Sequence, residues 1–384
     1  MGMDQRSRAC MTRMNRSTKQ TLSDLRWYLV NGMHWLRNRK HQDHAEGPLV
    51  LVDIRDNVWH RYLHILLLFL HSSGSVVHIR HRYRFIGSWA SHDLFSRSAF
   101  FRIVFRPLAP DAYQLVLTDR PMDGPHVLLD PDYFDLPEAP REGMRLPMSM
   151  ADTFYIQGLH MRSDPDPEHP RERCLFFFGN MDRAAYDRPE PRIAFGCFTR
   201  TALFDLLKDG YKERIFEPSR LSEVALRGKR DIVLLGRQCE YIPPARLLQV
   251  LSRFDLFLAP SGVVMPLCHN VVEAMAAGCI PVLQYPHLME PPLEHGINCL
   301  AYDNAEQLHT VLERFPDISA TEVVAMRRHV LAYYKEHLAP EAVVEKLRTL
   351  AGKQARLRVN AEMLSTQLLL EQRTDQDRTV MAGQ

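Results

Sequence analysis

Short apolar runs rich in Val, Ile and Leu alternate with amphipathic segments along the first 130 residues. The runs at 48–54 and 75–81 are typical of buried strands, and they flank a helical pattern at 59–74 that Gly74 is expected to end. Such a β-α-β unit builds a parallel sheet, because the helix returns the chain to the same end of the sheet. Further strands are predicted at 101–105, 113–118 and 126–130.

The same alternation restarts after two Pro-rich and charged segments, 130–143 and 162–173, which are typical of loops and linkers. Helices are predicted at 200–210, 243–254 and 270–277, between strands at 174–180, 231–236, 255–262 and 280–286. We therefore predict an α/β fold with two Rossmann-like, doubly wound domains that face each other across a cleft. The expected divisions are a basic helical segment at 1–47, a first domain at 48–165, a second domain at 172–338 and a helical tail at 339–384.

Length and composition exclude several classes of protein. A chain of 384 residues is long enough for two domains, and its net charge of +2 gives no reason to expect nucleic acid as a partner. The seven cysteines form no C-x-x-C pair, which favours reduced thiols in a cytoplasmic protein over disulfides or a zinc site. No apolar run approaches the roughly 18 residues of a membrane span.

The first 40 residues are basic and also carry aromatic side chains. Nine Arg and Lys residues stand there against Asp4 and Asp24, and Trp27, Tyr28 and Trp35 lie among them. A helix of this kind is expected either to pack on the protein with a solvated basic face or to lie on an anionic membrane. We favour packing and keep peripheral membrane contact as the alternative.

Three loops follow strands of the second domain and contain glycine, at 179–180, 236–237 and 261–262. Glycine lets a backbone approach a ligand closely, and a following helix offers free N–H groups to a phosphate. Arg200 and Arg237 are expected to add charged contacts to a diphosphate. Each loop alone is equally compatible with ordinary turn chemistry.

Glu273 lies in a predicted helix whose neighbouring side chains are apolar, and a buried glutamate requires a partner. In one interpretation Asn270 is the N-cap and Glu273, three residues later, completes a capping box. In the other, the carboxylate binds a pair of ligand hydroxyls, as an acidic residue binds ribose in dinucleotide folds. The residues alone divide these interpretations evenly.

The stretch from Pro266 to Leu308, "PLCHNVVEAMAAGCIPVLQYPHLMEPPLEHGINCLAYDNAEQL", resembles the donor-binding signature of GT-B glycosyltransferases. "GCIPV" and the upstream "FFFGN" and "RTALFDLL" resemble the exostosin-like branch, and the resemblance covers about 172–310. It implies a GT-B fold and transfer of a sugar from a nucleotide diphosphate to a glycan or glycolipid, in surface polysaccharide or glycoconjugate synthesis. By this resemblance Glu273 holds the ribose, with the diphosphate near Arg200. The predicted donor-binding residues are Gly179, Asn180, Arg200, Arg237, Ser261, Gly262, Asn270 and Glu273.

One position departs from the retaining enzymes of this kind, which carry a second glutamate eight residues before the first. Met265 stands there, whereas the exostosin-like family is inverting. An inverting transfer requires a general base for the acceptor hydroxyl. The segment after the first strand offers Asp53, Asp56 and His60, of which we favour Asp56; Asp152 is a further candidate, and capping of the next helix is an equally good explanation.

Two Asp-x-Asp sequences, at 130–132 and 164–166, resemble the metal-binding motif of the GT-A fold. Asp-Pro-Asp is also a common turn, so we expect neither a metal nor a cofactor besides the nucleotide sugar. Two alternatives remain open: a nucleotide-sugar epimerase of GT-B fold, and a non-catalytic relative that binds nucleotide or glycan.

Overall fold

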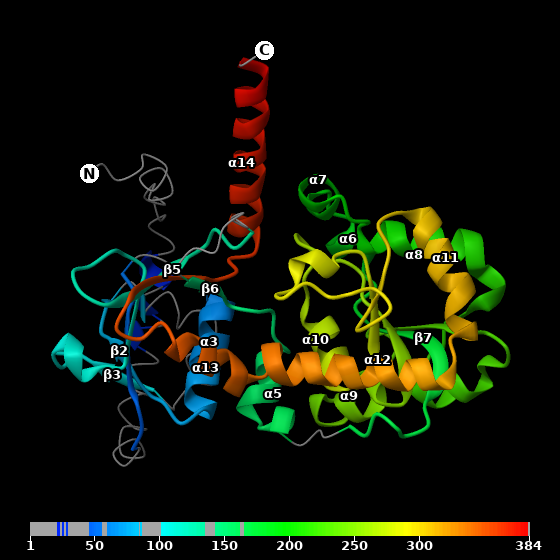
Figure 1. Cartoon of the computed structure of the whole chain (residues 1–384), viewed down its shortest axis with the longest axis horizontal. Helices are drawn as coiled ribbons and strands as arrows, with labels where there is room; N and C mark the ends of the chain where they lie inside the picture. Colours follow the sequence, from blue (N-terminus) through cyan, green and yellow to red (C-terminus); the bar gives the residue numbers. More distant parts are fainter. Residues whose placement is uncertain are drawn as a thin grey trace.

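The chain forms two parallel β-sheets with their helices, lying side by side along the long axis of the molecule (Figure 1). This confirms the predicted α/β architecture with two doubly wound units. The computed structural model describes residues 21–23, 25–26, 28–29, 46–55, 60–83, 85–86, 101–134, 143–161 and 165–382. Asp56, the side chain of His60 and most of the basic segment at 1–47 lie outside the described residues.

The first sheet has seven parallel strands in the order β3-β2-β1-β4-β5-β13-β6. The order reverses direction between β1 and β4, the place where ligands bind in open α/β sheets. Helix α3 (His60–Ser72) is buried along nearly its whole length, which fits its continuous apolar sequence, and Gly74 follows it at φ 77°. The strands are β1 (Leu49–Asp53), β2 (Val76–Arg80), β3 (Arg102–Val104), β4 (Leu115–Thr118), β5 (His126–Asp130), β6 (Gly143–Arg145) and β13 (Gln354–Arg358).

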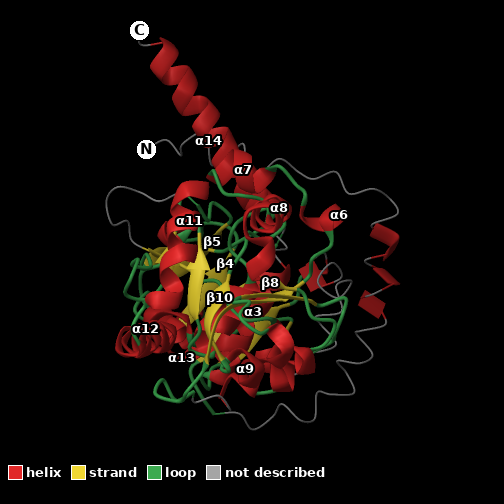
Figure 2. Ribbon diagram, turned by 90° about the vertical axis from the view of Figure 1, so that its right-hand side faces the viewer, coloured by secondary structure: helices red, strands yellow, loops and turns green. Residues whose placement is uncertain are grey.

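The second sheet has six parallel strands in the order β12-β11-β10-β7-β9-β8, which places its reversal between β7 and β10. Helices cover both faces of the sheets in the view turned by 90° (Figure 2). The strands are β7 (Glu172–Gly179), β8 (Ile215–Phe216), β9 (Ile232–Gly236), β10 (Phe254–Leu258), β11 (Ile280–Leu283) and β12 (Leu300–Ala301). The helices that bear on the site are α6 (Arg183–Tyr186), α7 (Glu190–Phe195), α8 (Arg200–Tyr211), α9 (Pro244–Leu251) and α10 (His269–Ala276).

The C-terminal part of the chain returns from the second domain to the first. Helix α12 (Ala320–Tyr333) continues through a π-helical turn into α13 (Pro340–Arg348), which packs on α3 (Figure 1). The expected helical tail at 339–384 is interrupted by β13, which pairs with both β5 and β6. Helix α14 (Met363–Ala382) then projects away from the body of the molecule (Figures 1 and 2).

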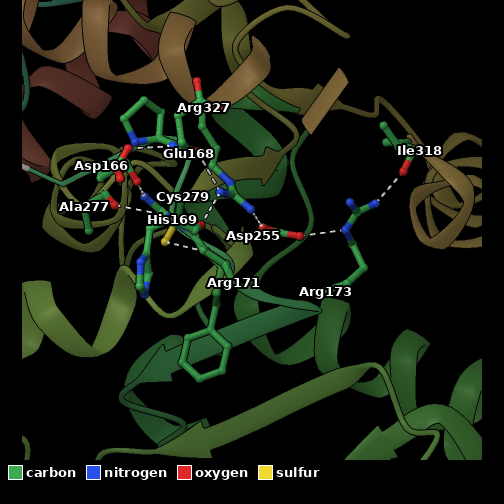
Figure 3. A network of polar contacts seen from close by, with 12 residues as sticks. Asp166, Glu168, His169, Arg171, Arg173, Asp255, Ala277, Cys279, Ile318 and Arg327 are labelled. Atoms are coloured by element: carbon green, nitrogen blue, oxygen red, sulfur yellow. Dashed lines mark hydrogen bonds and ion pairs between the residues drawn. The ribbon is translucent and has the colours of Figure 1, made fainter. Parts of the chain in front are cut away.

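A buried ion network lies at the amino ends of β7 and β10 (Figure 3). Asp255, which is 1% exposed, accepts hydrogen bonds from Arg173 Nε at 2.6 Å and from the Arg327 guanidinium. Arg327 also donates to the carbonyls of Pro167 and His169 at 2.8 and 2.9 Å. The network therefore fastens the described part of the interdomain linker to the second sheet, at the end opposite the carboxyl ends of its strands.

Among the described residues, we find no helix that has both the length and the apolar character needed to cross a membrane.

Candidate functional site

Arg200 joins the two loops that flank the reversal point of the second sheet. Its Nε donates to the carbonyl of Ser261 at 3.3 Å and its NH1 to that of Asn180 at 2.8 Å. The guanidinium also lies 3.8 Å from the ring centroid of Tyr186, in a cation–π contact, and the residue is only 3% exposed. The structure thus brings together three predicted donor-site residues, with a fixed positive charge between the carboxyl ends of β7 and β10.

Helix α8 places Arg200 at its first position for a local reason. Thr199 is the N-cap, and its hydroxyl accepts a hydrogen bond from the N–H of Ala202 at 3.1 Å. The positive end of the helix dipole therefore reinforces the Arg200 charge at the edge of the sheet. An anion placed there would meet both.

The loop after β9 lies against the loop after β7. The N–H of Arg237 donates to the carbonyl of Gly179 at 2.7 Å, while the Arg237 side chain is exposed and its guanidinium stands 5.9 Å from the Tyr241 ring. Arg237 therefore reaches solvent beside the site, where its charge also acts on Glu273. The predicted residues of this loop are brought to the same edge as Arg200.

Gly262 is required by the turn that follows β10. A Cβ at this position would lie 2.8 Å from the carbonyl oxygen of Met265 and 3.1 Å from that of Leu267, and the Gly262 N–H donates to the carbonyl of Pro266 at 3.1 Å. The loop is folded back on itself so tightly that only glycine fits. It leads directly into α10.

A pocket of about 290 Å³ opens at the carboxyl ends of β7 and β9, beside α8. Its volume is close to the lower bound of about 300 Å³ usual for small-molecule sites. Thr201 lines the pocket, is 5% exposed, and its buried hydroxyl has no hydrogen-bond partner within the described part of the chain. Since buried hydroxyls are normally satisfied, this atom is an unexplained polar group in the wall of the pocket. Other lining residues include Tyr186, Arg200, Gly236, Gln238 and Cys239.

Helix α10 does not begin as a capping box. Its N-cap is Cys268, with no side-chain capping bond, so Asn270 already lies inside the helix and Glu273 stands beyond the first turn. The Asn270 side-chain oxygen accepts a hydrogen bond from the Cys268 thiol instead. The capping interpretation of Glu273 is therefore wrong, because the chain enters the helix two residues earlier than that interpretation requires.

Glu273 faces the first domain. Its Oε1 accepts a long hydrogen bond of 3.3 Å from the N–H of Ala151, and the residue is 8% exposed. Burial raises the pKa of Glu273 to about 7. The hydrogen bond from the Ala151 N–H and the charge of Arg237 lower the pKa, but they do not offset the effect of burial. A carboxyl group with so little compensation is poorly placed for stability and suited to bind hydroxyl groups of a ligand.

One helical turn before Glu273, His269 makes the second contact between α10 and the first domain. Its Nδ1 donates a hydrogen bond of 2.7 Å to the carbonyl of Ser149. Its ring stacks on that of Tyr62 in α3, with 6.3 Å between the ring centroids. Burial lowers the pKa of His269 to about 4, so the ring is neutral at physiological pH. The face of α10 that carries Glu273 is thereby held against 149–151.

Met265, eight residues before Glu273, is buried against the C-terminal part of the chain. Its sulfur accepts a hydrogen bond of 2.9 Å from the amide of Asn360, a residue that is 1% exposed. Thr366 adds a hydrogen bond of 3.3 Å to the carbonyl of Val264. Asn360, which follows β13, and Thr366 of α14 thus fix the loop that leads into α10.

The base candidates occupy different surroundings. Asp53, at the reversal point of the first sheet, is paired with Arg82 at 2.8 Å and Arg80 at 2.9 Å. Burial raises its pKa, but the hydrogen bonds and charges of these arginines outweigh burial and hold the pKa below its ordinary value. Asp152, in the first turn of α5 (Asp152–Ile156), directly follows Ala151, and its carboxylate lies 3.9 Å from His64 Nε2.

The Asp-Pro-Asp sequence at 130–132 forms a turn. Asp130 accepts a hydrogen bond from the N–H of Asp132 at 3.0 Å and pairs with Arg356 at 2.8 Å, and Asp132 accepts one from the Gln372 amide. In the described parts of the chain, no three His, Cys, Asp or Glu side chains gather in a way that could hold a metal ion.

Several site residues were not among the predictions. Tyr186 and Thr201 border Arg200, and Ala151 meets Glu273 from the other domain. Thr201 follows a predicted residue directly, so its place at a helix start was a usable signal. The contact of Ala151 joins residues 122 apart in the sequence, and no local pattern indicates it.

Comparison with known proteins gives no match to a protein-family model and none among curated proteins. Among solved structures, the chain is similar to Anabaena HepE in complex with UDP, with 13% identity over 79% of this chain and 99% of that chain and a TM-score of 0.36. The chain is also similar to a glycosyltransferase from Rickettsia africae, with 8% identity over 79% of this chain and 98% of that chain and a TM-score of 0.43. For Arabidopsis thaliana UGT89C1 complexed with quercetin, the identity is 12% over 79% of this chain and 99% of that chain, with a TM-score of 0.38. Scores this low leave the residues of the site as the basis for a functional assignment.

Proposed function

We propose that this protein is a glycosyltransferase of GT-B type that moves a sugar from a nucleotide diphosphate to a glycan or glycolipid acceptor. The observation that carries the proposal is the meeting of the Asn180, Ser261 and Arg237 loops around buried Arg200, with Glu273 facing the first domain nearby. This arrangement offers positive charge and free helix N–H groups for a diphosphate and a carboxylate for a ribose. The sequence resemblance at 266–308 supports the same reading.

In this proposal Arg200, Arg237 and the start of α8 stabilise the negative charge that develops on the departing diphosphate. The guanidinium of Arg200 is already fixed by two carbonyls and the Tyr186 ring, so little reorganisation is needed when charge appears. The pocket beside Thr201 would take part of the nucleotide. The proposal assigns no role to a metal ion. These cationic groups alone stabilise the charge on the diphosphate as it leaves.

We propose an inverting course, because the position of the sugar-contacting glutamate of retaining enzymes holds Met265, whose sulfur is engaged by Asn360. The acceptor hydroxyl then loses its proton to a base while its oxygen attacks the sugar carbon and the bond to the diphosphate breaks. Asp56 and His60 remain proposed candidates. Among described side chains, Asp152 is better placed than Asp53, since it adjoins the Ala151–Glu273 contact and is not paired with two arginines.

A screen of thermal shifts with UDP, GDP, CMP and ADP tests the proposal. A nucleotide at about 100 times its dissociation constant is expected to stabilise the wild type by roughly 2.7 kcal/mol. The stabilisation should disappear in Glu273→Ala while that variant stays folded. If no nucleotide stabilises the wild type, the glycosyltransferase assignment fails and a non-catalytic protein becomes the better account; consumption of the donor without acceptor would indicate an epimerase.

The base is tested by comparing Asp152→Asn with Asp53→Asn under the donor identified in the screen. We expect Asp152→Asn to lower kcat by about 10²-fold or more, with little change in donor affinity. Asp53→Asn should act mainly on stability, because it leaves Arg80 and Arg82 without their partner. Equal, small effects of both substitutions on kcat would return the role to Asp56 or His60.

A further inference from the structure

All seven strands of the first sheet are parallel, so the residues that follow them share one edge. At the β13 and β6 end this edge touches the second domain, through Asn360 on Met265 and Ala151 on Glu273. The rest of the edge, after β3, β2, β1 and β4, continues away from these contacts. It is the edge where ligands bind in open α/β sheets.

This continuing part of the edge is strongly basic. Its described residues include two carboxylates, and both are engaged within the protein: Asp53 pairs with two arginines, and Asp119 accepts a hydrogen bond from the N–H of Arg55 at 3.0 Å. Across the four strand ends taken together, the arginines outnumber these two carboxylates, and the surplus of positive charge lies after β2 and β3. The arginines of this basic edge are Arg55, Arg80, Arg82, Arg106 and Arg120.

Aromatic side chains stand beside the basic edge. His81 lies between Arg80 and Arg82 in the sequence. Its ring stacks on that of Phe105, with 4.4 Å between the ring centroids and 20° between the ring planes. Its Nε2 lies 2.7 Å from the Tyr28 hydroxyl. Phe105 is 64% exposed, and Tyr83 meets Tyr28 edge to face. Exposed aromatic area next to guanidinium groups suits a ligand that has both an apolar face and a negative charge.

We infer that the acceptor carries an anionic group, a carboxylate or a phosphate, that binds to the basic edge of the first sheet. This inference rests on the proposed function, which it extends by naming the chemical class of the acceptor. Arg55 and Arg106 have exposed side chains and are the residues that would meet the anion, while Arg80 and Arg82 are oriented by Asp53. The exposed ring of Phe105 lies against the apolar face of the sugar.

The test is direct binding, by calorimetry at low salt, of four probes to the full-length protein. Tetragalacturonate presents carboxylates, maltotetraose is the neutral control of similar length, glucose 1-phosphate presents a phosphate, and inorganic phosphate controls for the anion alone. The variant is Arg55→Gln with Arg106→Gln. Its matched control is Arg246→Gln, which removes an exposed arginine from α9 in the second domain.

We expect at least one charged sugar to bind the wild type, maltotetraose to bind at least tenfold more weakly, and raised salt to weaken the charged probe. The double variant should lose about tenfold in affinity for the charged sugar, as two charge-assisted contacts disappear. Which charged sugar responds tells a carboxylate acceptor from a phosphate acceptor. Arg246→Gln should bind like the wild type.

The inference is overturned if maltotetraose binds as well as the charged sugars, if inorganic phosphate accounts for all of the binding, or if Arg246→Gln weakens it equally. Its failure is separable from that of the proposed function. Nucleotide binding with no charged-sugar binding contradicts the anionic acceptor alone. Charged-sugar binding through Arg55 and Arg106, with no nucleotide binding, supports the basic edge while the glycosyltransferase assignment fails.

Discussion

Two buried carboxylates stand at opposite ends of the second sheet, Asp255 at the amino end of β10 and Glu273 beyond its carboxyl end. Asp255 is bound by Arg173 and Arg327, whereas Glu273 has one long hydrogen bond from a backbone N–H and a pKa raised to about 7. The first is fully compensated and holds the linker and β10 together (Figure 3). The second is left short of partners, as expected of a group kept for a ligand.

The same contrast extends to the neighbours of each carboxylate. Around Asp255, both arginines are paired with its carboxylate and donate further to backbone carbonyls of the linker and of Ile318, whereas Arg200 has carbonyl partners and no carboxylate partner among the described residues. Around Glu273, Arg237 reaches solvent and the Thr201 hydroxyl beside Arg200 has no partner in the described chain. This contrast is the basis for proposing that the amino end of the sheet serves stability and the carboxyl end serves binding.

The largest expected effect is on stability and belongs to the amino end. Asp255→Asn should destabilise the protein by about 3–5 kcal/mol, because two arginines are left without their carboxylate in a buried place. Denaturant unfolding measures this. As a control, Asp205→Asn breaks an exposed pair with Arg183 and should cost less than about 1 kcal/mol. If both substitutions lower the free energy of unfolding equally, the buried network of Asp255 contributes no more to stability than an exposed ion pair.

The next effect has the opposite sign and belongs to the carboxyl end. The folded-state pKa of Glu273 is raised from 4.5 to about 7, so ionisation costs stability as pH rises through that range. Glu273→Gln keeps the acceptor for the Ala151 N–H and removes the charge. It should therefore be more stable than the wild type by on the order of 2 kcal/mol at pH 8, and nearly equal to it at pH 4.5.

Unfolding of both proteins across this pH range is the measurement. A wild type that is the more stable of the two at pH 8 would show that the Glu273 carboxylate is compensated after all, and the contrast with Asp255 would be lost. If Glu273→Gln gains stability and also loses nucleotide binding, the contrast between Glu273 and Asp255 is strengthened.

The smallest effect concerns Thr201. Because its hydroxyl has no partner in the described chain, Thr201→Val should leave the free energy of unfolding unchanged or slightly higher. It should weaken nucleotide binding by about fivefold, the value of one hydrogen bond. Calorimetric titration with the nucleotide found in the screen decides this. Unchanged affinity would remove the pocket from the donor site.

Much of the fold was predictable because the apolar runs have the length of single strands and end at turn residues. The segments between them have the hydrophobic pattern of helices. The predictions at 48–54, 75–81 and 231–236 correspond to β1, β2 and β9. Strand β13 was missed, although Gly352 and the alternating polar and apolar residues of Gln354–Arg358 are sequence signals of a turn and a strand. Its partners, β5 and β6, lie more than 200 residues earlier, so the pairing itself has no local signature.

The candidate site was predictable where residues follow strands. Asn180, Arg200 and Ser261 were expected at one edge and are joined by hydrogen bonds. Glu273 was identified as a buried glutamate in need of a partner, but the sequence did not indicate Ala151. Contacts between domains depend on how two folded units meet, and the base on the first domain stays a proposal for the same reason.

The measurement that tests the central claim most directly is a comparison of ribose with deoxyribose. The nucleotide diphosphate that gives the largest thermal shift and its 2′-deoxy form are titrated into the wild type and into Glu273→Gln. We predict that the wild type prefers the ribose form by about tenfold, since a charged acceptor loses a hydroxyl partner, and that Glu273→Gln loses most of this preference. Equal binding of both forms by the wild type, or an undiminished preference in Glu273→Gln, would contradict a ribose-binding role for Glu273.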